Sequence, residues 1–117
     1  MTIIDDGTNT FNGGSALNIA APLVGATYGI PGIVIAGNYT NTASNALTFN
    51  GGTTPTLAGV IYFPNANVSF SGGAVTSGSN CFEIVANVIS FSGGATTAST
   101  CAGFGASVGP SVATLVQ

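Results

Sequence analysis

The chain has 117 residues, of which 45% are apolar, 18 are glycine and only 3% are charged. The charged residues are Asp5, Asp6 and Glu83, and there is no lysine, arginine or histidine. Nothing in the chain neutralises phosphate groups, which excludes ordinary nucleic-acid binding. Because the usual catalytic acids and bases are missing apart from these three carboxylates, the sequence predicts neither an enzyme nor a cofactor or metal site.

The length suits one domain, and the many apolar and turn-forming residues favour an all-β fold over a helical bundle or a disordered chain. No apolar run approaches the ~20 residues that span a bilayer, and the first residues lack the features of a signal peptide. Two cysteines in a chain rich in Ser, Thr, Asn and Gly fit an oxidising compartment. We therefore expect one domain over residues 1–117, a mature or truncated piece of a secreted bacterial protein from the extracellular space or the cell envelope.

Two short motifs recur along the chain. The first reads polar–Phe–polar–Gly–Gly and occurs at 10–14, 48–52, 69–73 and 90–94. The second is an apolar segment that ends in asparagine and precedes the last three copies, as GIVIAGN at 32–38, GVIYFPN at 59–65 and CFEIVAN at 81–87. Aligned on their asparagines, these units predict two short strands separated by a turn. A repeat of about 21 or 22 residues corresponds to one coil of a parallel β-solenoid.

The ends of the chain fit the same scheme. Residues 2–6 begin a first coil, residues 15–31 insert an extra strand and loop, and residues 101–107 with 111–117 complete a fifth coil. The sequence thus predicts an all-β fold, a parallel β-solenoid (β-helix) of about five short rungs. An antiparallel sandwich with turns every 8–12 residues is a rival that the spacing leaves open.

Cys81 and Cys101 open successive units, at the position that Gly32 and Gly59 hold in the earlier ones. Equivalent positions of stacked rungs lie one strand spacing apart, within the reach of a disulfide. We therefore predict one inter-rung disulfide, which closes a loop of about 20 residues and adds roughly 3 kcal/mol of stability. The alternative is two unpaired buried thiols.

The repeated phenylalanines are the candidate core. Strand alternation places Phe11, Phe49, Phe70 and Phe91 on one face, which predicts an internal ladder of stacked rings. Their neighbours then form two outward rows of small polar side chains: Thr10, Thr48, Ser69 and Ser90 in one, and Asn12, Asn50, Ser71 and Ser92 in the other.

The strands that precede the asparagines are apolar on both faces. The repeat alignment assigns Ile33, Ile35, Val60, Tyr62, Phe82 and Ile84 to the inward face. The outward face then carries Val34, Ile61, Phe63 and Val85, together with Glu83, whose charge needs solvent because the chain has no cation. We expect Val34, Ile61, Phe63 and Val85 to form a partner-facing stripe. The alternative is that residues 15–31 fold over these side chains.

Further candidate sites are weak. Asp5 and Asp6 are adjacent, so a strand points them to opposite faces, and a turn or end cap explains them better than catalysis or a partial calcium loop. Glu83 has no second carboxylate at an equivalent position, as glycoside hydrolysis would require. The sequons that begin at Asn38 and Asn67 are expected by chance in such a composition.

The C-terminal half resembles one known family. The order "GVIYFPN…SFSGG…C…VAN.ISFSGG…C", the closing "VATLVQ" and the earlier "AAPLVGATYGIPGIVIAG" are similar to the C-terminal region of TadG-like proteins, which are associated with assembly of tight-adherence (Flp) pili. The similarity covers about residues 16–117. It implies an envelope or extracellular location, a structural or assembly role without catalytic residues, and a pairing of Cys81 with Cys101.

Three functions follow, in order of preference. The first is a structural cell-surface or pilus-associated module that self-assembles head to tail into filaments, with copies of itself or other surface proteins as partners. The second is a glycan- or ice-binding module that uses the Thr, Ser and Asn rows. The third is a degraded carbohydrate-active β-helix.

Overall fold

The computed structural model describes residues 1–74 and 81–97. Within these ranges the regular structure consists of strands alone. They are β1 (Ile3–Asp5), β2 (Asn9–Phe11), β3 (Asn18–Ala20), β4 (Ile33–Gly37), β5 (Leu47–Phe49), β6 (Thr56–Phe70) and β7 (Phe82–Phe91). Cys101 and the predicted closing strand at 111–117 lie outside the described residues.

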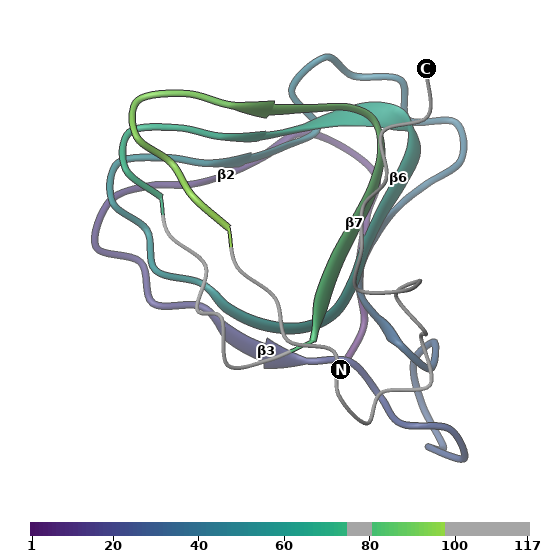
Figure 1. Ribbon diagram of the computed structural model, residues 1–117. Helices are drawn as coiled ribbons and strands as arrows, with labels where there is room; N and C mark the ends of the chain where they lie inside the picture. The colour runs from purple at the N-terminus through teal and green to yellow at the C-terminus, as the bar shows by residue number, and fades with distance from the viewer. Residues whose placement is uncertain (75–80, 98–117) are drawn as a thin grey trace, which may run out of the picture.

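All described strand pairs are parallel, and β6 is the centre of the sheet. The strands run in the order β1-β4-β6-β5-β2, and β3 and β7 also pair with β6. The short strands β3, β4 and β5 pair in turn with the beginning, middle and end of β6, whereas β7 follows β6 from Gly59 to Phe70. Successive passes of the chain therefore lie over one another, and the sheet curls around its own interior with a triangular outline (Figure 1).

The predicted β-solenoid of about five short rungs is wrong. The structure has one curled sheet of parallel strands, shaped like part of a barrel wall, with strands that range from three to 15 residues. The main reason is that β6 continues through Asn65, where the repeat predicted a turn. Of the two cysteines of the predicted inter-rung disulfide, Cys81 is among the described residues and Cys101 lies outside them. The rival antiparallel sandwich is wrong as well, since every described pairing is parallel.

A bulge in β6 sets the register of the sheet. Before it Phe63 pairs with Ala86, and after it Asn67 pairs with Val88, so residues 64–66 of β6 lie opposite Asn87 alone. The repeat alignment had matched Asn65 to Asn87, which puts each pair before the bulge one position out of register, whereas the pairing of Phe70 with Phe91 after the bulge is as predicted. Because side chains alternate along a strand, this error exchanges the inward and outward faces of the strand before the bulge.

The core fills the inside of the curl. Its largest fully buried side chains are Phe49, Phe63, Phe70, Ile35, Leu47, Leu57, Ile61, Val34 and Val68. They come from β4, β5 and β6, which have neighbouring strands on both sides. The predicted insertion at 15–31 contributes β3 and then a loop that projects from the sheet (Figure 1). Thr2 supports this loop, since its Oγ1 accepts a hydrogen bond from the Ile30 N–H at 2.8 Å and donates to the Ile33 carbonyl at 2.9 Å.

Candidate functional site

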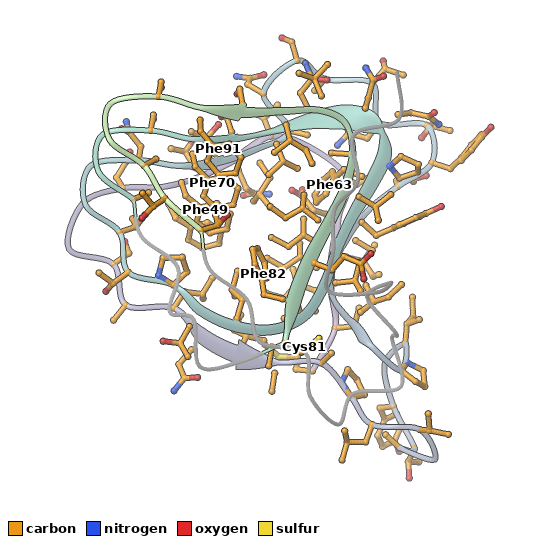
Figure 2. All side chains as sticks on the ribbon, viewed as in Figure 1. Phe49, Phe63, Phe70, Cys81, Phe82 and Phe91 are labelled. Atoms are coloured by element: carbon orange, nitrogen blue, oxygen red, sulfur yellow. The ribbon has the colours of Figure 1, made fainter. Side chains whose placement is uncertain are left out.

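The four repeated phenylalanines stack inside the sheet. Their ring centroids are 5.2 Å apart for Phe11 and Phe49, 4.9 Å for Phe49 and Phe70, and 5.2 Å for Phe70 and Phe91. Figure 2 shows the rings of Phe49, Phe70 and Phe91 over one another within the curl. Phe49 and Phe70 are fully buried, but Phe91 is 47% exposed. Among the described residues, the ladder thus ends in an accessible ring at β7.

The predicted interface stripe is not a surface feature. Val34, Ile61 and Phe63 are at most 1% exposed and belong to the hydrophobic core, whereas Val85 is 38% exposed. The register explains the difference: Ile61 pairs with Ile84 on the inward face and not with Glu83 as the repeat suggested. The stripe of four residues is therefore wrong as an interface. The alternative was that residues 15–31 fold over these side chains. Such a cover is not needed, because Val34, Ile61 and Phe63 already face the interior of the sheet.

A different apolar column faces outward. Ile4, Ala36, Tyr62 and Val85 are register neighbours across β1, β4, β6 and β7. Ile4, Tyr62 and Val85 are exposed, and Glu83 beside them is only half-buried. The sequence placed Val85 correctly on this face but assigned Tyr62 to the inward one, because only the bulge reveals which residue of β6 aligns with Val85.

Hydrogen bonds link neighbouring side chains within each of the two outward polar rows. Thr10 pairs with Thr48, Thr48 with Ser69 and Ser69 with Ser90 in the register of the sheet. The hydroxyls of Thr48 and Ser69 lie 3.0 Å apart and share a hydrogen bond, and Ser71 Oγ donates to Asn50 Oδ1 at 3.1 Å. These hydrogen bonds join neighbouring strands, so they stabilise the sheet. They also use some of the hydrogen-bonding groups that the polar rows would otherwise offer to a ligand.

A cavity opens at the other end of the sheet, beside the edge strands β1 and β2. Its volume is about 120 Å³, and it is lined by Ile3, Asp5, Asn9, Phe11, Ile35 and Leu47. Most of the lining is apolar, as expected where the core reaches the first pass of the chain. Within the described residues β1 pairs only with β4, and β2 only with β5.

Asp5 is the charged side chain of this cavity. The residue is only 6% exposed, and its Oδ1 accepts a hydrogen bond from the Gly7 N–H at 3.0 Å. The other oxygen, Oδ2, is buried without a hydrogen-bond partner. The sequence predicted a turn or cap role for Asp5, and the bond to Gly7 is of that kind. It gave no sign of the cavity, because the neighbours of Asp5 come from distant segments.

The remaining arrangement offers little for catalysis or metal binding. Asp6, next to Asp5, is exposed, so the two carboxylates do not share a site. No group of three or more His, Cys, Asp or Glu that would hold a metal ion occurs among residues 1–74 and 81–97. In the same ranges there is no helix long and apolar enough to cross a membrane.

Comparisons with protein-family models, with curated proteins and with solved structures found no match to this chain. The resemblance to TadG-like proteins therefore remains a hypothesis that rests on the motifs alone.

Proposed function

We propose that this protein is a structural module of the bacterial cell surface, related to pilus assembly, that associates end to end with copies of itself. The observation that carries the proposal is the continuity of its side-chain columns from one end of the sheet to the other. Phe11 at β2 and Phe91 at β7 belong to one column of stacked rings, and both are accessible to solvent. A second copy placed one strand spacing beyond β7 would continue that column.

Exposed inward-facing side chains at β7 support the same contact. Ile89 pairs with Val68, which is fully buried, yet Ile89 itself is exposed, as is Phe91. Within the part of the chain that the structure describes, β7 pairs only with β6, and a strand edge with apolar side chains is a template for pairing with another chain. Because opposite ends of the molecule meet in such a contact, it is heterologous and extends into a filament unless the rotation closes a ring. The net charge of only −3 opposes such association weakly.

The proposal predicts that a charge at the β7 end stops assembly. Ile89→Lys places an ammonium where an apolar side chain would be covered, whereas Val24→Lys adds the same charge on the projecting loop, at a position that is 94% exposed. We expect wild type and Val24→Lys to form multimers in sedimentation velocity and filaments in negative-stain electron microscopy. Ile89→Lys should sediment as a monomer, with the circular dichroism spectrum of the wild type. Wild-type protein that stays monomeric at millimolar concentration would refute end-to-end assembly.

The surface location has its own test. Immunogold labelling of intact producing cells should decorate the cell surface or its appendages, without permeabilisation. Labelling that appears only after permeabilisation would contradict a surface role, while leaving the assembly itself untouched.

A second candidate function is binding of glycans or ice by the outward polar rows. The in-register column of Thr10, Thr48, Ser69 and Ser90 favours it, since it repeats small hydroxyl groups at the strand spacing. The hydrogen bond between Thr48 and Ser69 weighs against it, because those groups partly satisfy each other. Glycan-array binding or inhibition of ice recrystallisation by the wild type, lost in Thr48→Val, would support this function over the structural one.

A further inference from the structure

Large apolar side chains gather on the projecting loop, residues 21–32, which connects β3 to β4. Val24 is 94% exposed and Tyr28 86%, and Leu23 and Ile30 are exposed as well. The loop contains no charged residue. Single exposed apolar residues are ordinary on a protein surface, but several on one short loop mark a site of contact with another molecule.

Hydrogen bonds and close packing hold the loop in this shape. The Gly32 N–H donates to the Pro22 carbonyl at 2.9 Å, which closes the base of the loop, and the Ala26 N–H donates to the Leu23 carbonyl at 3.1 Å. A Cβ atom on Gly29 would lie 2.6 Å from Pro22 Cγ, so the two sides of the loop pack directly against each other. The fold therefore fixes these apolar side chains in solvent.

The size and shape of the loop favour a lipid surface over a protein partner. A stable protein interface takes about 20–30 residues from each side, and residues 21–32 supply about half of that number. A bilayer needs no matching groove and accepts apolar side chains from a single projecting segment. Figure 1 shows the loop beyond the triangular outline of the sheet, where a flat surface can reach it. Tyr28 suits the boundary between headgroups and acyl chains, because its ring is apolar and its hydroxyl is polar.

The charge of the chain limits which lipids can attract it. Without lysine, arginine or histidine, and with a net charge of −3, the protein gains nothing from anionic headgroups. Its binding then comes from burial of apolar side chains, which salt does not screen.

We propose that the projecting loop docks the protein on a lipid bilayer, with Leu23, Val24 and Tyr28 in the interfacial layer of zwitterionic lipids. The inference goes beyond the proposed function, because the contact between copies joins β7 to β1 and β2, whereas this loop lies between β3 and β4. Each copy in a filament presents one loop, and many loops on one filament bind a surface more tightly than a single loop does.

The test is flotation of the full chain with phosphatidylcholine vesicles in a density gradient, over a range of lipid concentrations. We expect the wild type to float, and Val24→Ser and Tyr28→Ser to partition at least about fivefold more weakly, because each loses an apolar group that the bilayer covers. Tyr39→Ser is the matched control, since Tyr39 is 76% exposed but lies between β4 and β5, and it should match the wild type. Wild type that does not float, which would leave a protein as the occupant, or equal losses in Tyr28→Ser and Tyr39→Ser, would overturn the proposal.

Lipid charge and salt provide an independent check. Replacing part of the phosphatidylcholine with anionic phosphatidylglycerol should not strengthen binding, and raising sodium chloride from ~0.05 to ~0.5 M should not weaken it. Binding that requires the anionic lipid, or that disappears at high salt, contradicts apolar docking.

Tyrosine fluorescence locates the contact. The chain has three tyrosines and no tryptophan, so Tyr39→Phe combined with Tyr62→Phe leaves Tyr28 as the one remaining tyrosine. Bromine atoms placed near the headgroup end of the acyl chains should quench its emission. Flotation without quenching would assign the binding to another surface and overturn the role of the loop.

A last arm separates membrane docking from assembly. Ile89→Lys, which is blocked at the β7 contact, should still float and should lose binding when Tyr28→Ser is added. Failure of the wild type to form filaments leaves this result unchanged, whereas an Ile89→Lys protein that does not float would overturn docking through a single loop.

Discussion

At the scale of single residues, the glycine pairs that follow the phenylalanines show how tightly successive passes of the chain are stacked. Gly51, Gly72 and Gly93 occupy the first position of three Gly-Gly turns, and all have positive φ. A Cβ atom on Gly72 would lie 2.8 Å from the Gly51 nitrogen, and one on Gly93 would lie 2.8 Å from the Gly72 nitrogen. The second glycine of each pair has positive φ too, but open space around it.

Because a Cβ atom would clash at Gly72 but not at Gly73, we predict different losses in the free energy of unfolding for alanine substitutions at these two positions. Gly73→Ala adds only the strain of a left-handed backbone (φ +78°), about 1–2 kcal/mol. Gly72→Ala adds the same strain and a clash with backbone that cannot move freely, so we expect an additional loss of about 1–3 kcal/mol in the free energy of unfolding. Urea unfolding followed by circular dichroism measures both. Equal losses would show that the turns stack more loosely than the structure indicates.

At the scale of elements, β6 shows what the sequence predicts and what it does not. The repeat predicted the column from Phe11 to Phe91, because the register after the bulge keeps the spacing that the two SFSGG motifs display. It failed before the bulge, where the paired residues lie further apart in the chain and the strand is apolar on both faces. In a strand where polar and apolar residues alternate, the pattern would have shown which face points inward and so revealed the one-residue error in register. This part of β6 is apolar on both faces, so its sequence does not distinguish them. The Asp5 cavity was missed for a related reason, since its walls come from four separate strands.

The register of β6 makes a prediction for two adjacent residues. Phe63 is buried in the core and Tyr62 faces outward beside Val85. Phe63→Glu removes a packed ring and buries an unpaired charge, so its cost should exceed the roughly 3–5 kcal/mol typical of Phe→Ala and leave the chain largely unfolded. Tyr62→Glu should change the free energy of unfolding by about 1 kcal/mol or less.

Circular dichroism and the dispersion of amide NMR signals distinguish the two outcomes. A folded, monomeric Phe63→Glu protein would instead match the outward stripe that the repeat alignment predicted. Tyr62→Glu is the matched control, because it introduces the same charge one residue away on the opposite face.

At the scale of the whole molecule, the two ends of the curled sheet are chemically different. The β1 and β2 end has the open cavity with Asp5, whereas the β7 end exposes Ile89 and Phe91. A contact between copies that uses one end of each has a direction. Each subunit then binds one neighbour through its β1 and β2 end and the next neighbour through its β7 end. A subunit that is blocked at only one end can therefore join a filament and stop its growth, which does not happen in side-by-side association.

Mixing experiments separate these modes of association. A subunit with Ile89→Lys is blocked at β7 but keeps an intact β1 and β2 end, so it can add to a growing filament and then prevent further addition. With one blocked subunit in ten, mean filament length should fall to on the order of ten subunits, since growth stops at each blocked copy. Val24→Lys, mixed at the same ratio, should leave the length distribution in electron micrographs unchanged. If Ile89→Lys lowers only the number of filaments and not their length, the variant is excluded from them, and the directional contact through β7 is ruled out.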